Sequence, residues 1–109
     1  MITEDEVEAA VRELIDGADD IGRAKADLVY AEAYKKSVKA MVMKDSRFGN
    51  MPVSAQEREA YASKEYGDQL NKIREATLNY ETLRARRVGL EMQIETWRSG
   101  NANRRAVKL

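Results

Sequence analysis

The sequence contains no cysteine, no histidine and only one proline among its 109 residues. Without cysteine and histidine, the chain has no disulfide framework, no zinc cluster and no Ser–His or Cys–His nucleophile. No apolar run approaches the roughly 20 residues that a membrane-spanning helix needs. The first residues are acidic, which is atypical of signal and transit peptides. These absences predict a non-enzymatic cytoplasmic protein that needs no metal and no cofactor.

Aromatic residues are scarce at 6%, whereas charged residues reach 35%. Ala, Glu, Lys, Leu and Arg dominate, and this composition favours long helices or coiled coils over a compact mixed fold. A chain of this length is expected to form one small domain. The predicted fold class is therefore all-α.

Acidic and basic residues balance overall, but they are unevenly distributed along the chain. Residues 1–20 hold eight acids and one base, a net charge of −7, and residues 84–109 hold seven bases and two acids, a net charge of +5. The middle, residues 21–83, holds eleven bases and nine acids, a net charge of +2. This division suggests a basic interaction tail or antiparallel self-pairing. The helix dipole is an adequate explanation for the acids in the first turn, but it does not explain the basic residues beyond Gly100.

The first helix has a recognisable start, because Thr3 and Glu6 form a capping-box pattern with Thr3 as the N-cap. Apolar residues then follow with steps of three and four, and Gly17 is expected to end the helix. Because Gly22 only weakens the start of the next helix, a kink in place of a full break is the alternative. We therefore predict a helix over residues 3–16. A second helix is predicted over residues 18–45, where small and apolar residues keep a heptad-like spacing.

Residues 46–53 are predicted to form a loop, because a Gly-Asn pair supplies a turn and Pro52 cannot continue a helix. A second capping-box pattern, Ser54 with Glu57, then predicts the start of a third helix over residues 54–98. One irregularity in the apolar spacing of this helix has two successive steps of three, which is typical of a local overwinding. It involves Thr77, Tyr80 and Leu83.

The third helix is nearly as long as the first two together. The economical architecture is a long antiparallel, coiled-coil-like hairpin with an additional short N-terminal helix, forming one domain over residues 1–98. A single partner helix could not bury all of the large aromatic residues, so we expect a homo-oligomer, a dimer or larger. A monomeric three-helix bundle is the alternative. The aromatic residues concerned are Tyr30, Tyr34, Tyr61, Tyr66, Tyr80 and Trp97.

Residues 99–109 are predicted to form a flexible basic tail, because Gly100 and two asparagines are expected to stop the helix. Basic residues before and within this tail, together with one tryptophan, have the composition of a phosphate-binding surface with a stacking platform. Two alternatives stay open: Trp97 belongs to the core, and the arginines are neutralised by the acidic N-terminal segment. The candidate nucleic-acid-binding residues are Arg84, Arg86, Trp97, Arg98, Arg104, Arg105 and Lys108.

A second cationic set lies in the second predicted helix. Lys35, Lys36 and Lys39 share one helical face, and Lys44 follows. Such a set usually forms a solvated surface, and a weak phosphate track is the other interpretation.

Several strings resemble a group of small helical bacteriophage and prophage proteins. The most specific are Gln56–Tyr61 and Trp97-Arg98, and the resemblance covers about residues 25–105. Members of this group are often encoded near phage genes for recombination and single-strand DNA handling. The resemblance therefore implies an accessory role in phage DNA metabolism, in the cytoplasm of an infected bacterium, and it supplies no catalytic residues.

We accordingly expect a protein that binds DNA or a protein of the recombination apparatus. One rival is an inhibitor or adaptor that binds a host protein, such as an anti-defence factor, since an acidic segment can imitate the charge of DNA. The other rival is a structural or assembly protein.

Overall fold

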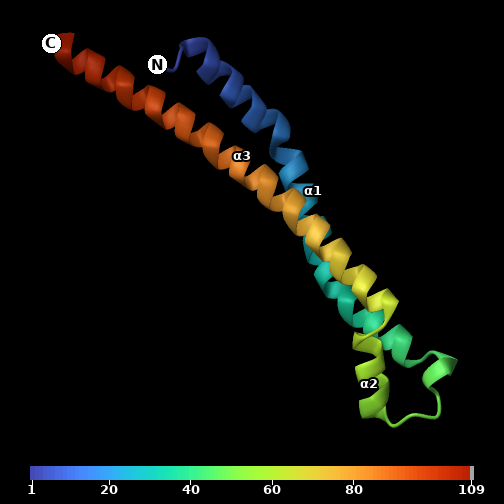
Figure 1. The fold of residues 1–109 in the computed structure, drawn as a ribbon. Helices are drawn as coiled ribbons and strands as arrows, with labels where there is room; N and C mark the ends of the chain where they lie inside the picture. The colour runs from blue at the N-terminus through green and yellow to red at the C-terminus, as the bar shows by residue number, and fades with distance from the viewer. Residues whose placement is uncertain (109) are drawn as a thin grey trace. The chain divides into compact units, whose positions relative to one another are not determined.

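The computed structural model describes residues 1–108, the side chains of Ser46 and Lys108 excepted. Within these residues the chain is all-α, as predicted, and contains no strand. The elements are α1 (Glu4–Met43), the 3-10 helix η1 (Ser46–Phe48), α2 (Val53–Tyr61) and α3 (Lys64–Lys108) (Figure 1). Short turns and bends separate α1, η1 and α2.

The start of α1 agrees with the sequence. The backbone N–H of Glu6 donates to Oγ1 of Thr3 at 3.2 Å, so Thr3 caps the helix as predicted. The expected break at Gly17 is wrong, because α1 continues through it to Met43. A glycine costs a helix about 1 kcal/mol relative to alanine, and packing of the apolar face outweighs that cost.

The predicted helix over residues 54–98 is wrong in its interior and at its C-terminal end, whereas its predicted start lies within one residue of the observed one. Its N-terminal part is the separate helix α2, which begins at Val53 after Pro52 and has no side-chain cap, so Ser54 does not form the expected capping box. The hydroxyl of Ser63 donates to the carbonyl of Ala60 at 2.6 Å and accepts from the N–H of Tyr66 at 3.1 Å. Ser63 thereby ends one helix and caps the next.

The expected non-helical tail is also wrong, because α3 continues to Lys108. Gly100, Asn101 and Asn103 lie inside the helix, and the side chain of Arg104 donates to Oδ1 of Asn101 at 2.6 Å, one turn back. Such a contact between residues three apart supports a helical turn.

A heptad pattern of burial runs along each long helix, with alternating steps of three and four. All of these positions are buried or half-buried except Arg87, which is exposed. In α1 they are Val7, Ala10, Leu14, Gly17, Ile21, Ala24, Leu28, Ala31, Lys35, Val38 and Val42. In α3 they are Tyr66, Gln69, Ile73, Ala76, Tyr80, Leu83, Arg87, Leu90, Ile94, Trp97 and Asn101.

This pattern corrects the predicted irregularity in α3. Ala76 and Thr77 are both half-buried, and Ala76 takes the heptad position between Ile73 and Tyr80. The steps of three and four are therefore unbroken, and the overwinding that was predicted from Thr77 is not required.

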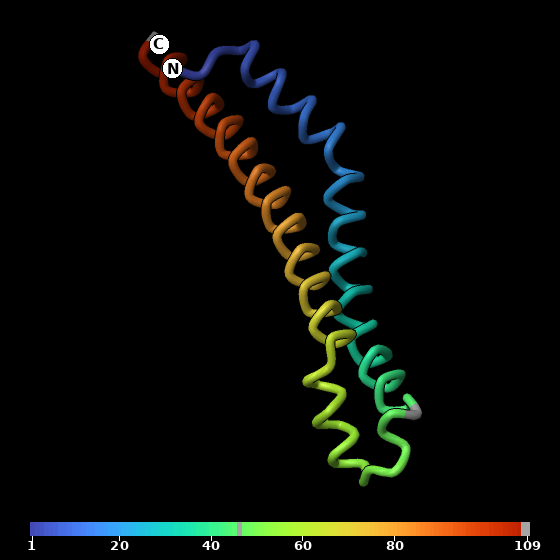
Figure 2. The backbone as a smooth tube through the Cα atoms, turned by 45° about the vertical axis from the view of Figure 1, so that its right-hand side comes forward, coloured from blue at the N-terminus to red at the C-terminus, as the bar shows by residue number. Residues whose placement is uncertain are grey.

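The chain forms two compact units. Unit 1 joins Met1–Gly22 to Glu81–Leu109, and unit 2 is Arg23–Tyr80. Within unit 1, both views place the first residues of α1 toward the C-terminal end of α3, so these two segments are antiparallel (Figure 2).

Unit 2 has the same antiparallel order. Lys25 of α1 lies over the ring of Tyr80, whereas Lys39, farther along α1, contacts Tyr61, which lies earlier in the chain. Its best-buried cluster lies between the end of α1 and α2, beside the turn, and contains Val38, Val42 and the fully buried Ala60. Each unit is thus an antiparallel helical pair, as the hairpin prediction requires.

Candidate nucleic-acid interface

The arginines that the sequence singled out are mostly held by neighbouring acids. In unit 1, Nε and Nη2 of Arg86 donate to the two carboxylate oxygens of Glu13 at 2.7 and 2.8 Å. This hydrogen bond lowers the pKa of Glu13 below its ordinary value and raises that of Arg86. The acidic N-terminal segment therefore neutralises one of the predicted phosphate contacts, the alternative that the sequence left open.

The other arginines of this set contact acids or amides on their own helix. Arg84 pairs with Glu81 at 3.5 Å and Arg98 with Glu95 at 3.4 Å, while Arg104 bonds to an asparagine. Such exposed pairs contribute at most about 1 kcal/mol, so a phosphate could displace them. Arg105 is exposed, and the side chain of Lys108 lies outside the described part of the chain.

Trp97 occupies a heptad position of α3 and is half-buried. Its place in the repeat favours a packing role over that of a stacking platform, which was the other alternative from the sequence. Nucleic-acid binding by these seven residues stays a prediction.

Net charge makes unit 2, and not unit 1, the part of the molecule better suited to binding phosphate. Unit 2 contains eleven bases and eight acids and carries +3, while unit 1 contains eight bases and eleven acids and carries −3. The folding of the acidic N-terminal segment against the basic C-terminal segment thus leaves unit 1 acidic. The excess of positive charge, which favours binding to phosphate, lies in unit 2.

An open hollow on one flank of unit 2 gathers lysines and tyrosines. The lysines come from one face of α1, and the tyrosines come from the end of α2 and the start of α3. We call it the lysine–tyrosine hollow, lined by Lys35, Lys36, Lys39, Ala40, Met43, Tyr61 and Tyr66.

Lys39 is fixed inside this hollow by two partners. Its ammonium donates to Oε1 of Glu57 at 2.6 Å and to the hydroxyl of Tyr61 at 2.8 Å. The hydrogen bond from Lys39 lowers the pKa of Glu57, and the bonds to Glu57 and then Tyr61 raise the pKa of Lys39. Lys35 and Lys36, by contrast, make no ion pair within the part of the chain that the structure describes. Within this hollow they are the cations that remain available to an anion, Lys36 being exposed and Lys35 half-buried.

The two tyrosines form an aromatic wall beside these lysines. Tyr61 and Tyr66 are in edge-to-face contact, with ring centroids 5.2 Å apart and an interplanar angle of 86°. Tyr61 is 51% exposed, although the ammonium of Lys39 lies over its ring, 4.5 Å from the centroid. An exposed aromatic ring beside free ammonium groups can accept a base by stacking and the adjoining phosphate by charge.

Sequence reasoning identified the lysines of this hollow but not its tyrosines. Tyr61 and Tyr66 are separated from Lys36 by more than twenty residues, and only the antiparallel return of the chain brings them together. The signal that could have found Tyr61 is its place in the Gln56–Tyr61 string, which follows the predicted turn directly.

Other kinds of site find no support in the described residues. They contain no group of acidic side chains arranged to hold a metal ion. None of the helices, over the range that the structure covers, is long and apolar enough to cross a membrane. No protein-family model, curated protein or solved structure matches the chain.

Proposed function

We propose that the protein is a non-enzymatic binding protein for single-stranded DNA, and that unit 2 receives the strand in the lysine–tyrosine hollow. The observation that carries this proposal is the position of unpaired Lys35 and Lys36 beside the half-exposed Tyr61. Single strands expose both their bases and their phosphates, and proteins bind them through aromatic rings combined with a cationic groove. A duplex offers no unstacked base to this wall.

The role that fits such an activity is accessory DNA handling in a phage, in replication or recombination, inside the bacterial host. The resemblance of Gln56–Tyr61 to phage proteins supports this setting, and Tyr61 of that string belongs to the hollow.

Fluorescence anisotropy with a labelled oligothymidine at low salt tests the proposal. We expect the double variant Lys35→Gln/Lys36→Gln to weaken binding by about tenfold, because two phosphate contacts are lost. The matched control, Lys44→Gln/Lys64→Gln, removes the same charge from unit 2 outside the hollow and should bind nearly as the wild type does. Thermal melts of all three proteins establish that they are folded.

Three results with these proteins, and a fourth from salt titration, would oppose the proposal. They are no binding by the wild type at low salt, equal losses in both double variants, and tighter binding to duplex than to single strands. Binding that hardly changes with salt concentration would also count against phosphate contacts, since each one released by salt lowers the affinity.

A second candidate function rests on the acidity of unit 1. Eight of the eleven acids of this unit lie on α1, where Asp16 and Asp20 line an open hollow together with Glu13 and Arg12. This surface suits a basic partner, such as the DNA-binding face of a host protein. Capture of one host nuclease by the wild type, abolished by Asp16→Asn/Asp20→Asn and unaffected by Lys35→Gln/Lys36→Gln, would favour this adaptor or inhibitor role.

A further inference from the structure

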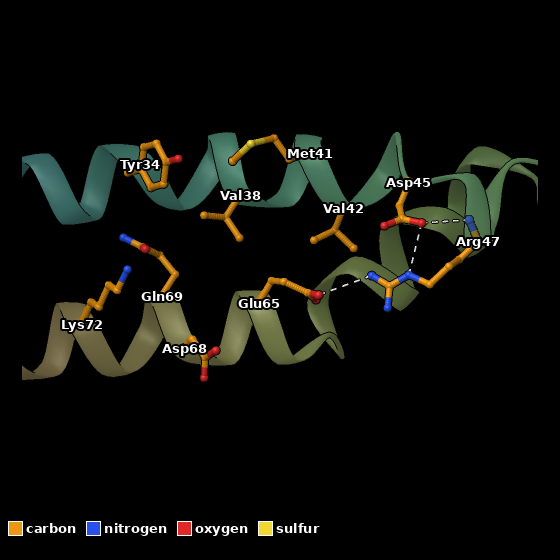
Figure 3. Close-up of a pocket in the computed structure, with 10 residues that line it drawn as sticks. All are labelled: Tyr34, Val38, Met41, Val42, Asp45, Arg47, Glu65, Asp68, Gln69 and Lys72. Carbon is orange, nitrogen blue, oxygen red and sulfur yellow. Dashed lines mark hydrogen bonds and ion pairs between the residues drawn. The ribbon is translucent and has the colours of Figure 1, made fainter.

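A second groove lies on the other flank of the helical pair in unit 2 (Figure 3). Val38 and Val42 of α1 form its floor, and Tyr34 and Met41 stand on its α1 side. Tyr34 and Lys36 are about 200° apart around α1, at 100° per residue, so this groove and the lysine–tyrosine hollow face different directions.

The apolar surface of this groove is not covered by the chain itself. Met41 is 54% exposed and Tyr34 is 36% exposed. Tyr30, which is 68% exposed, stacks on Tyr34 with ring centroids 5.7 Å apart and continues the same surface by one turn. A helical pair with apolar residues beyond its own seam typically buries them against further helices in a bundle.

The α3 side of the groove is charged, and its charges are ordered. Glu65 and Asp68 lie toward the start of the helix, and Lys72 lies one to two turns farther on (Figure 3). Arg47 joins Glu65 to Asp45, with Nη2 3.4 Å from Glu65. Asp68 and Lys72 make no ion pair with any described residue. The groove thus has an acidic end and a cationic end.

We propose that this groove binds a second copy of the chain across a two-fold axis, with the two α3 segments antiparallel. A two-fold contact is self-complementary, so the acidic end of one copy meets the cationic end of the other. Lys72 then faces the partner's Glu65, and the reverse contact forms at the same time. The two Asp68 side chains lie near the axis, each one turn from the Lys72 of its own helix. A parallel arrangement would place like charges opposite each other. The ordered charges therefore select both the partner and its direction.

The apolar groups complete the contact. Tyr34 and Met41 of each copy enter the groove of the other and become buried there, giving a core of four helical segments. Each copy keeps its lysine–tyrosine hollow open on the other flank. A dimer therefore carries two hollows, and a strand that reaches both is held more tightly than by one alone. Dimer formation itself does not depend on nucleic-acid binding.

Sedimentation equilibrium without nucleic acid tests this proposal. We expect a wild-type dimer, and we expect Lys72→Glu and Glu65→Lys each to weaken it by about tenfold, since like charges then meet twice. An equimolar mixture of these two variants should recover the wild-type affinity. In the mixed dimer the two substituted side chains face each other, and so do the two unchanged ones, so each contact again joins a carboxylate to an ammonium.

A matched pair of apolar variants examines the groove separately. Met41→Lys should abolish the dimer, whereas Leu78→Lys changes a similarly exposed apolar residue of unit 2 outside the groove and should leave it intact. The proposal is overturned by a wild-type monomer at all concentrations, by equal effects of these two variants, or by a mixture of charge variants no tighter than either alone. Melting curves identify any variant that fails to fold.

Discussion

Arg86 and Glu13, which are 73 residues apart in the sequence, meet through two hydrogen bonds of 2.7 and 2.8 Å. The contact joins the acidic N-terminal segment to the basic C-terminal one inside unit 1. It explains why the basic end of the sequence does not become the basic unit of the fold, since the acids of α1 outnumber the bases that they meet. The proposed DNA contact consequently moves to Lys35 and Lys36 in unit 2.

The stability that this pair contributes should depend on pH. Because the pKa of Glu13 is lowered in the folded state, the contribution is present above its ordinary value of 4.5 and is lost as the pH falls through the lowered folded value. Glu13→Gln should therefore lower the melting temperature at neutral pH and have little effect in strong acid. Thermal melts over this pH range measure the difference.

A control is available on the same helix. Glu8→Gln removes the same charge but breaks no ion pair of the described residues, so its melting temperature should stay near that of the wild type. High salt should also reduce the effect of Glu13→Gln, because both partners are exposed. An effect of Glu13→Gln that persists unchanged in acid would contradict the assignment of this stability to the ion pair between Glu13 and Arg86.

Removal of Glu57 should strengthen DNA binding. Its carboxylate holds the ammonium of Lys39 at 2.6 Å, so Glu57→Gln frees that cation for phosphate and removes a repelling charge. We expect the oligothymidine affinity to rise by about threefold to tenfold at low salt and the gain to shrink as salt is added. Glu59→Gln, on the same helix, removes an equal charge outside the hollow and serves as the comparison in anisotropy titrations. Equal gains in both variants would point to net charge alone.

Gln69 gives a prediction about the pairing register of unit 2. It is 4% exposed at a heptad position of α3, and its Nε2 donates to the carbonyl of Ala31 at 2.9 Å. A buried polar group of this kind specifies register at some cost in stability. Gln69→Leu should therefore raise the melting temperature, because the carbonyl already lies within a helix and leucine fills a similar volume.

The same variant should weaken the specificity of the pairing. Cysteines placed next to Ala31 on one helix and next to Gln69 on the other would report register by disulfide trapping, and Gln69→Leu should broaden the set of pairs that cross-link. A large loss of stability in Gln69→Leu would mean that the amide hydrogen bond outweighs its desolvation, against this expectation.

Local signals in the sequence were sufficient to predict the all-α fold class, the cap at Thr3 and the antiparallel pairing of the helices. They were insufficient at Gly17 and Gly100, because a glycine signals a helix end only where packing does not continue the helix. The break at Ser63 was missed since no proline or glycine marks it. Tyr61 escaped notice as a site residue because its neighbours in the hollow lie on another helix.

The turn of unit 2 should depend strongly on its small core. Val42 is 5% exposed and packs with Val38 and the fully buried Ala60. Val42→Ala should lower the free energy of unfolding by about 2 kcal/mol, from lost apolar burial and the cavity left behind. Val53→Ala makes the same chemical change at a 69% exposed site and should cost less than about 0.5 kcal/mol. Urea denaturation of both variants measures the contrast.

Two glycines test whether the long helices are continuous. Gly17 and Gly100 lie inside α1 and α3, neither has a positive φ, and an added Cβ would meet no atom within 4 Å at either position. Gly17→Ala and Gly100→Ala should therefore each stabilise the fold by about 0.5 to 1 kcal/mol and increase its helical circular dichroism. If Gly17 ended a helix in the left-handed conformation, alanine would destabilise the protein instead. The sign of the change in melting temperature thus distinguishes one continuous α1 from the two helices predicted by the sequence.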